Sequence, residues 1–255
     1  MNTLISILLN IINNTLTDNT TREIARQILR MYPVIDNVKA SEIAEKSFCN
    51  TSTVNRFCKS LGFKSFMDLK SYIMVSHGVR QAQLLHHMEV CDPQKMLDNI
   101  RILSSGDFDE KEFIETCRKI NKIIYKAPAA ICVGAVYPEA LMFHYMEDMI
   151  EMGKCIYNSP VSRELTVPTE PDNTAVIMIS FTGRLFRYCS SEFNEICSKY
   201  KDIIVMTADE EFLAKKPEGA FRLPFSGDDE VNNAAFIEMM RYLKYDYFVS
   251  YYAEK

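Results

Sequence analysis

Apolar positions recur at intervals of three and four residues through the first third of the chain, the spacing of amphipathic helices. The run 4–13 has this spacing, and a second run begins near Thr20 and stops before Pro33, which cannot continue a helix. Gly62 supplies a left-handed C-terminal position for a later helix. The predicted helices of this part span residues 4–13, 20–32, 41–46, 52–60 and 66–75.

From about residue 110, short apolar runs alternate with helical spacing. Runs such as Ala130-Ile131-Cys132-Val133 are apolar throughout, which is typical of strands buried on both faces of a sheet. The predicted strands span residues 129–134, 154–157, 175–180, 202–207 and 221–223, and the predicted helices 110–125, 138–152, 185–200 and 231–247. This alternation predicts a doubly wound parallel sheet.

The change of pattern predicts three segments and the fold class α plus α/β. We expect an all-α domain over residues 1–77, a linker over 78–107 that is helical or irregular, and an α/β domain over 108–255. Charge agrees with this division. The first 80 residues hold 10 Lys/Arg and 6 Asp/Glu, a net charge of +4, whereas the remainder carries −9. A basic N-terminal segment followed by an acidic remainder is typical of a nucleic-acid-binding module joined to a part that does not touch DNA.

The two short helices predicted at 41–46 and 52–60 have the features of a helix-turn-helix. Ala44 is small enough to let a second helix pack closely, and the connection 47–50 is short. Val54 and Phe57 are expected to face the core, so the polar positions between them face outward. Asn and Arg side chains are suited to bidentate contacts with adenine and guanine. The candidate DNA-binding residues are Thr51, Ser52, Thr53, Asn55, Arg56, Lys59 and Lys64. The alternative is an ordinary helical hairpin with a solvated polar face.

The same residues resemble the N-terminal domain of the RpiR family of bacterial regulators. The similarity is collinear over about 55 residues and is most specific in Thr53-Val54-Asn55-Arg56-Phe57-Cys58-Lys59-Ser60-Leu61-Gly62-Phe63. The resemblance implies that the helix bearing this string is the recognition helix, with Thr53, Asn55, Arg56 and Lys59 in that role.

In that family a sugar-isomerase (SIS) domain, a doubly wound α/β unit that binds phosphosugars, follows the linker. The run 175–183 resembles the family's strand and its Ser-x-Ser-Gly loop, with Thr182 in place of the second Ser. Hydroxyls and a glycine at the end of a strand can cradle an anion. The candidate ligand residues are Gly134, Ser180, Thr182, Gly183, Arg184 and Thr207.

The sequence departs from the family at the first strand, where a Gly-x-Gly-x-Ser loop is usual. Here Gly134 is followed by Ala135-Val136-Tyr137-Pro138, so the second Gly and the Ser are missing. Two alternatives stay open for this domain: an SIS-like ligand sensor, or a degenerate domain that only dimerises.

A third alternative is an SIS-type sugar phosphate isomerase, whose general base would be Glu139, His144 or Glu147. No nucleophile–base set is apparent, and the eight cysteines form no C-x-x-C pair, so we expect no catalytic residues, no metal and no cofactor. The apolar start of the chain lacks the basic region and cleavage site of a signal peptide. We therefore expect a cytoplasmic protein with no membrane partner.

These observations predict a DNA-binding transcription regulator rather than an enzyme. Its expected partners are a double-stranded DNA operator and a phosphosugar effector, with control of sugar or amino-sugar metabolism genes as its role. We expect the α/β domains to pair as a homodimer, or as a dimer of dimers, and so to space two recognition helices over a pseudo-palindromic operator.

Overall fold

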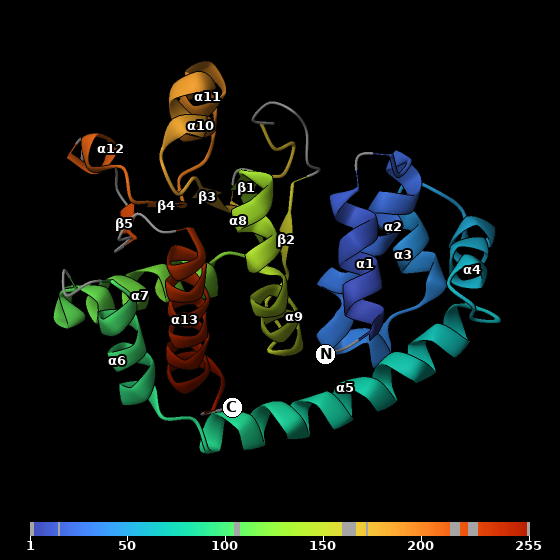
Figure 1. Ribbon diagram of the computed structural model, residues 1–255. Coiled ribbons are helices and arrows are strands. Elements are labelled where there is room, and N and C mark those ends of the chain that lie inside the picture. The colour runs from blue at the N-terminus through green and yellow to red at the C-terminus, as the bar shows by residue number, and fades with distance from the viewer. Residues whose placement is uncertain are drawn as a thin grey trace.

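The computed structural model describes residues 3–14, 16–104, 108–159, 167–171, 173–214, 220–223 and 229–253. A small helical part and a larger part built on one sheet lie side by side, joined by a long helix that runs beneath both (Figure 1). This arrangement confirms the predicted fold class.

The helical part is held together by the inward sides of its helices. Its elements are α1 (Thr3–Asn13), α2 (Asn19–Arg30), the 3-10 helix η1 (Tyr32–Asn37), α3 (Ala40–Lys46) and α4 (Thr51–Ser60). Side-chain caps fix where α2 and α4 begin: Asp18 accepts a hydrogen bond from the Thr21 amide, and Asn50 from the Thr53 amide. Ile5, Ile28 and Val54 are fully buried in the shared core.

The fifth helix is longer than its apolar spacing predicted. Instead of ending at Val75, α5 (Phe66–Glu89) is 24 residues long, and α6 (Pro93–Leu103) begins directly after the Asp92 cap. No proline interrupts α5, and its one glycine, Gly78, is tolerated at a modest cost. The segment expected to be a linker is therefore helical as far as Leu103, and residue 77 lies inside α5.

The larger part is a parallel sheet of five strands in the order β2-β1-β3-β4-β5. The strands are β1 (Ala130–Gly134), β2 (Ile156–Asn158), β3 (Ala175–Ile179), β4 (Ile203–Thr207) and β5 (Ala220–Arg222). The register pairs Ile131 with Val176 on one side and with Tyr157 on the other. The direction of winding reverses between β1 and β3, which makes the carboxyl ends of these two strands the topological switch point.

Helices lie on both sides of the row of strands (Figure 1). They are α7 (Glu110–Lys126), α8 (Val136–Leu141), α9 (Phe143–Glu151), α10 (Arg184–Tyr188), α11 (Ser190–Lys199), α12 (Glu210–Ala214) and α13 (Asp229–Tyr247), followed by the π-helical turn η2 (Phe248–Tyr252). Two helices predicted as continuous are each broken, at Met142 and at Cys189, where the backbone leaves regular helical geometry. The apolar spacing runs through both breaks, so it could not reveal them.

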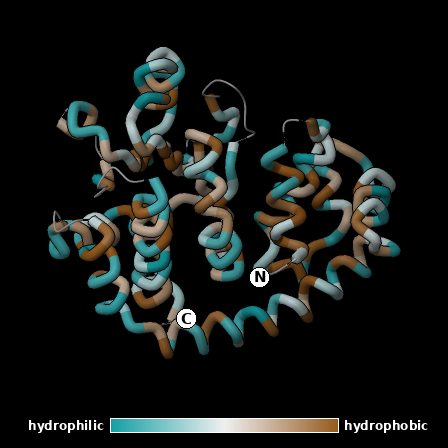
Figure 2. The backbone as a smooth tube through the Cα atoms, in the orientation of Figure 1, coloured by the Kyte–Doolittle hydropathy of each residue, from teal (hydrophilic) through white to brown (hydrophobic). Residues whose placement is uncertain are grey.

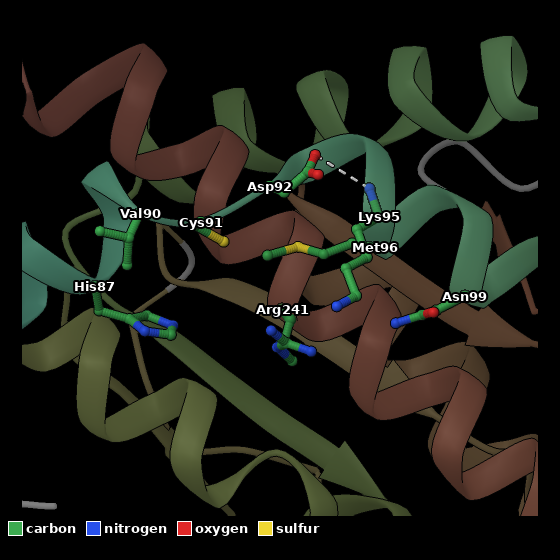
Figure 3. Close-up of a pocket in the computed structure, with 8 residues that line it drawn as sticks. All are labelled: His87, Val90, Cys91, Asp92, Lys95, Met96, Asn99 and Arg241. Carbon is green, nitrogen blue, oxygen red and sulfur yellow. Dashed lines mark hydrogen bonds between the residues drawn. The ribbon is translucent and has the colours of Figure 1, made fainter.

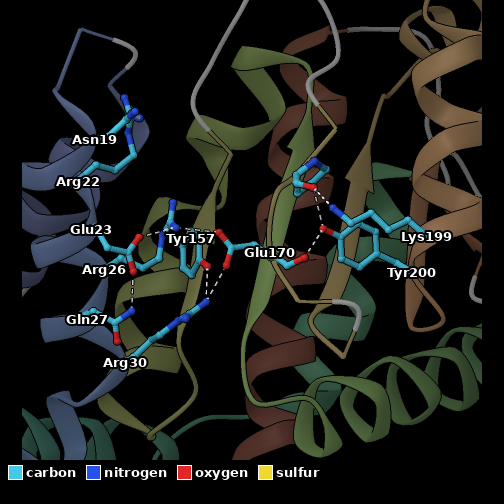
Figure 4. Close-up of polar contacts among 11 residues, drawn as sticks. Asn19, Arg22, Glu23, Arg26, Gln27, Arg30, Tyr157, Glu170, Lys199 and Tyr200 are labelled. Atoms are coloured by element: carbon cyan, nitrogen blue, oxygen red, sulfur yellow. Dashed lines mark hydrogen bonds and ion pairs between the residues drawn. The ribbon is translucent and has the colours of Figure 1, made fainter. Parts of the chain in front are cut away.

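The two parts are joined by buried polar contacts as well as by α5. Arg26 and Arg30 of α2 both form ion pairs with Glu170, at 3.0 and 2.8 Å, and Arg30 also donates to the Tyr157 hydroxyl of β2 (Figure 4). Tyr200 fixes the segment around Glu170 by donating to the backbone carbonyls of Pro168 and Glu170. The edge strand β2 is thus covered by the helical part.

Helix α9 contacts both the helical part and the connecting helix α5. Its buried acids Glu147, Asp148 and Glu151 meet, in turn, the Ser6 hydroxyl, Arg80 and His77. Lys244 of α13 also lies 2.6 Å from Asp148. Burial alone would raise the pKa of Asp148, but the charge and hydrogen bond of Lys244, with help from Arg80, lower it.

Candidate DNA-binding surface and ligand site

Helix α4 is positioned by its inner face. Val54, Phe57 and Cys58 are buried against the neighbouring helices, so the residues between them are turned outward. Burial raises the pKa of the Cys58 thiol to about 11, which keeps it protonated and apolar. The sequence therefore determines which side of α4 meets solvent.

The outward side of α4 presents unpaired cations. Arg56 and Lys59 are exposed, and no hydrogen bond or ion pair joins either side chain to another residue that the structure describes. Thr51 and Ser52 are exposed at the start of the helix, and Lys64 is exposed in the loop after it. Cations without internal partners are available to phosphates or guanine.

Two of the predicted contact residues have internal partners instead. The Thr53 hydroxyl donates to the Asn50 side chain at 3.0 Å, as part of the cap. The Asn55 carbonyl oxygen accepts from the Phe66 amide at 2.9 Å, and its amide nitrogen donates to the Thr51 carbonyl at 3.1 Å. Asn55 thus ties the middle of α4 to the start of α5.

A groove runs beside α4. A cavity of about 530 Å³ separates the beginning of α2 from α4 and is lined by Thr20, Thr21, Asn50, Thr53 and Arg56, among others. The α2 wall carries hydroxyl groups and the Asp18 carboxylate, and the α4 wall carries hydroxyl, amide and guanidinium groups. The hydroxyl, amide and guanidinium groups are the donor set that contacts nucleic-acid backbones.

Phe48, which the sequence reasoning passed over, lies in the turn between α3 and α4. Its φ of 52° is left-handed, a conformation that costs a non-glycine residue about 1–2 kcal/mol, and its side chain is 95% exposed. The connection between the two helices is short and contains no glycine. This pattern could have predicted that a non-glycine residue takes the left-handed conformation there.

The predicted ligand residues gather at the switch point of the sheet. Gly134 ends β1 so close to β3 that a Cβ there would overlap the backbone oxygen of Ile179. Ser180 directly follows β3, and Thr207 ends β4. The structure therefore brings Gly134, Ser180 and Thr207 to one edge, as the parallel order requires.

The polar groups of this edge already have internal partners. Ser180 Oγ accepts from the Leu185 amide at 3.4 Å, Thr207 Oγ1 from the Asp209 amide at 3.2 Å, and Thr182 Oγ1 from Arg184 Nε at 3.0 Å. Gly183 is left-handed, with φ 66°, and a Cβ there would overlap the carboxylate of Asp209, which also pairs with Arg187. A carboxylate of the protein itself therefore lies against the predicted anion loop.

Glu139, one of the three groups considered as a general base, lies at the same edge. Its carboxyl group is buried and accepts from the Gly134 backbone, and burial raises its pKa to about 8. His144 is 4.0 Å from Glu147 and 3.7 Å from Asp148, at the junction with the helical part. Glu147 lies on α9 and accepts from Ser6 at this junction, whereas Glu139 lies on α8. The two carboxyl groups therefore have different surroundings.

A separate cavity of about 600 Å³ lies where the end of α5 meets α6 and α13. His87, Lys95 and Arg241 bring basic groups to it, and Asp92 is occupied with capping α6 (Figure 3). Burial and then the nearby charges of Lys244 and Arg241 lower the pKa of His87. Sequence reasoning gave no sign of this cavity, because one of its walls comes from α13, which is far in the chain from α5 and α6.

The described residues were also compared with the requirements of a metal site and of a membrane-spanning helix. Among them, no group of three or more His, Cys, Asp or Glu side chains is placed to hold a metal ion. In the same set, no helix combines the length and apolarity needed to span a bilayer.

Comparisons with solved structures give distant neighbours. NanR of Vibrio vulnificus, in complex with ManNAc-6P, is 14% identical with a TM-score of 0.44, and the alignment covers 98% of this chain and 94% of NanR. A Methanococcus jannaschii protein, inferred to be a 3-hexulose-6-phosphate isomerase, is 14% identical with a TM-score of 0.46, covering 60% of this chain and 87% of its own. No curated protein matches the sequence.

The match that identifies a family lies in the helical part. Residues 5–77 match the family described as helix-turn-helix domain, rpiR family. This range covers most of α1, all of α2 to α4 and the first half of α5. This agrees with the resemblance found in the sequence and with the exposed cations of α4. Residues 5–77, which carry α4, are therefore similar to the helix-turn-helix domains of the rpiR family.

Proposed function

We propose that the chain is a DNA-binding transcription regulator that acts in the cytoplasm, without catalytic activity of its own, on genes of sugar or amino-sugar metabolism. The observation that carries the proposal is the outward side of α4, where Arg56 and Lys59 are exposed and unpaired within a helix-turn-helix domain. Arg56 is the residue we assign to a base edge, and Lys59 and Lys64 to phosphates. Thr51 and Ser52 stand beside them at the start of α4, and Thr53 and Asn55 chiefly hold the helix in place.

We further propose that the effector is a phosphosugar bound at the switch point, near Ser180, Thr182, Gly183 and Arg184. The position supports this, because ligands of doubly wound sheets bind outside the carboxyl ends of the strands. Since the Asp209 carboxylate borders Gly183, an anion there has to displace that carboxylate or bind beside it. Displacement of the carboxylate would be a local rearrangement, and it would couple binding to conformation.

DNA binding is tested with the full chain and with duplexes that it selects from a random library. Arg56→Ala is expected to weaken binding to the selected duplexes by about tenfold to a hundredfold, the usual loss of one bidentate base contact. Arg184→Ala is the matched control, since it removes the same group from the other part of the molecule. Failure of the wild-type chain to enrich any duplex, or equal binding by wild type and Arg56→Ala, overturns the assignment.

The effector is tested by thermal shift against sugar phosphates and amino-sugar phosphates. Stabilisation that Thr182→Ala or Arg184→Ala abolishes supports the switch-point site. Stabilisation lost instead in Lys95→Ala or Arg241→Ala moves the site to the cavity between α5, α6 and α13. If no sugar phosphate stabilises the wild-type chain, the sheet domain does not bind this class of ligand and the effector proposal is wrong.

A further inference from the structure

The cavity between the end of α5, α6 and α13 gathers basic side chains in the acidic part of the chain. Residues 81–255 carry a net charge of −9, yet His87, Lys95 and Arg241 line this one space, each from a different helix, and Asn99 adds an amide. Lys95, Asn99 and Arg241 point into the same space, and the His87 ring is directed toward it from α5 (Figure 3). We call this space the basic cavity.

Most of these polar groups have no use inside the chain. The side chains of His87, Lys95 and Asn99 form no hydrogen bond or ion pair with any residue in the described ranges. Arg241 Nη1 pairs with Glu238 at 2.6 Å, and the other guanidinium nitrogens of Arg241 have no partner in those ranges. Donors that converge on a concave surface without internal acceptors are available to the acceptors of a ligand.

The basic cavity is at positive potential. Asp92, the acid among its described lining residues, is occupied in accepting from two backbone amides of α6. Behind the cavity lies buried Lys244, which pairs with Asp148. Burial, and after it the charges of Lys244 and Arg241, lower the pKa of His87. The cavity therefore favours an anion over a neutral or cationic ligand.

The size and lining of the cavity limit the class of anion. Its volume of about 600 Å³ is in the range of pockets that hold small molecules. Val90 and Met96 give part of the wall an apolar surface. No Phe, Tyr or Trp is among the described lining residues, so a nucleobase would find no aromatic ring to stack on. Lys95 and Arg241 stand on different helices, so a ligand that contacts both needs more than one negative charge.

From this geometry we propose that the basic cavity binds a small organic acid carrying at least two negative charges. Arg241 presents a planar guanidinium suited to a carboxylate or phosphate group, Lys95 supplies a second charge, and His87 and Asn99 supply N–H donors. A ligand held in this way ties the end of α5 and the start of α6 to α13. The cavity is separate from the switch point and from α4, so this site does not depend on the DNA-binding or effector proposals above.

The decisive measurement is calorimetric titration of the full chain at constant ionic strength with succinate, citrate and glycerol 3-phosphate. At least one of these anions is expected to bind, and Lys95→Ala and Arg241→Ala are each expected to weaken it about tenfold, the loss of one charged contact. Lys119→Ala is the matched control, because it removes an exposed lysine of α7 and changes the net charge equally. It is expected to leave the affinity unchanged.

The three anions also separate the two sources of negative charge. Tighter binding of succinate or citrate identifies a polycarboxylate ligand, and tighter binding of glycerol 3-phosphate identifies a phosphate ester. Glycerol is the uncharged control and is expected not to bind. Failure of all three anions, equal weakening by Lys95→Ala and Lys119→Ala, or equal binding of glycerol overturns the proposal.

A second measurement uses the wild-type chain and so does not depend on folding of the variants. Hydrogen–deuterium exchange with the tightest of the three anions is expected to slow the amides of residues 87–99, where α5 ends and α6 begins. Slowing that appears only outside this range, or nowhere, overturns the proposal. Slowing confined to residues 180–185 would instead support the switch-point site, so the two ligand proposals fail separately.

Discussion

The outward side of α4 and the loop after β3 contain similar polar residues but differ in what those residues contact. On α4, Arg56 and Lys59 stand on a helix whose backbone groups satisfy one another, so the side chains stay free. At the loop, the Leu185 amide in the first turn of α10 and the Asp209 amide after β4 need acceptors, and the hydroxyls of Ser180 and Thr207 supply them. Residue type alone therefore does not distinguish polar side chains that are unpaired from polar side chains that already have hydrogen-bond partners within the chain.

The largest expected effect concerns the buried carboxyl group at the loop's edge. Glu139 has a pKa of about 8 in the folded chain against 4.5 as its ordinary value. Between these values the unfolded chain has lost the proton and the folded one keeps it, so stability falls as pH rises through this window, by something on the order of 4 kcal/mol, and levels off above it. Urea unfolding from pH 4.5 to 8.5 measures this.

Glu139→Gln is the matched variant, because it keeps an oxygen acceptor for the Gly134 amide and carries no charge. We expect its stability to exceed that of the wild type at pH 8 and the difference to shrink toward pH 4.5. A constant difference across the range would mean that Glu139 is solvated, and that this edge is open like the surface of α4.

The next effect tests whether the loop is closed on Asp209. Gly183→Ala is expected to cost about 3 kcal/mol, from the left-handed backbone and from overlap with the Asp209 carboxylate. Gly62→Ala is the control, since Gly62 is also left-handed, at φ 91°, but a Cβ there meets nothing. It should lose only about 1–2 kcal/mol. If chemical denaturation gives equal losses of stability for the two variants, the Asp209 carboxylate moves away readily and the loop is as accessible as α4.

The smallest effect divides the α4 surface itself. Asn55→Ala should lower stability by about 1–2 kcal/mol, because the buried Phe66 amide loses its acceptor, whereas Arg56→Ala should change stability by less than about 0.5 kcal/mol. On the selected duplexes, assayed well below both melting temperatures, Asn55→Ala should bind more tightly than Arg56→Ala. The reverse order in both assays would make Asn55 the base reader that the sequence suggested.

Much of the fold was predictable because it depends on local periodicity. Every strand and the first four helices were found within a few residues, and parallel order followed from alternation. The length of α5 was missed. Its apolar positions lie on two sides of the helix, so no single amphipathic stripe marks the part after Val75 as helical. The roles of Asn55 and Asp209 could not be predicted, since each depends on a backbone amide or glycine brought near by folding.

The acids of α9 have a consequence for how any signal reaches the recognition helix. Glu147 lies against Ser6 of the N-terminal domain, and Glu170 pairs with two arginines of its helix α2. Asp148 and Glu151 lie against Arg80 and His77 of the connecting helix α5. A slight tilt of that domain would strip several buried carboxylates of their partners simultaneously, which is costly at every intermediate angle. We therefore expect reorientation of α4 relative to the sheet to occur between two positions, each with these carboxylates paired, rather than as a graded swing.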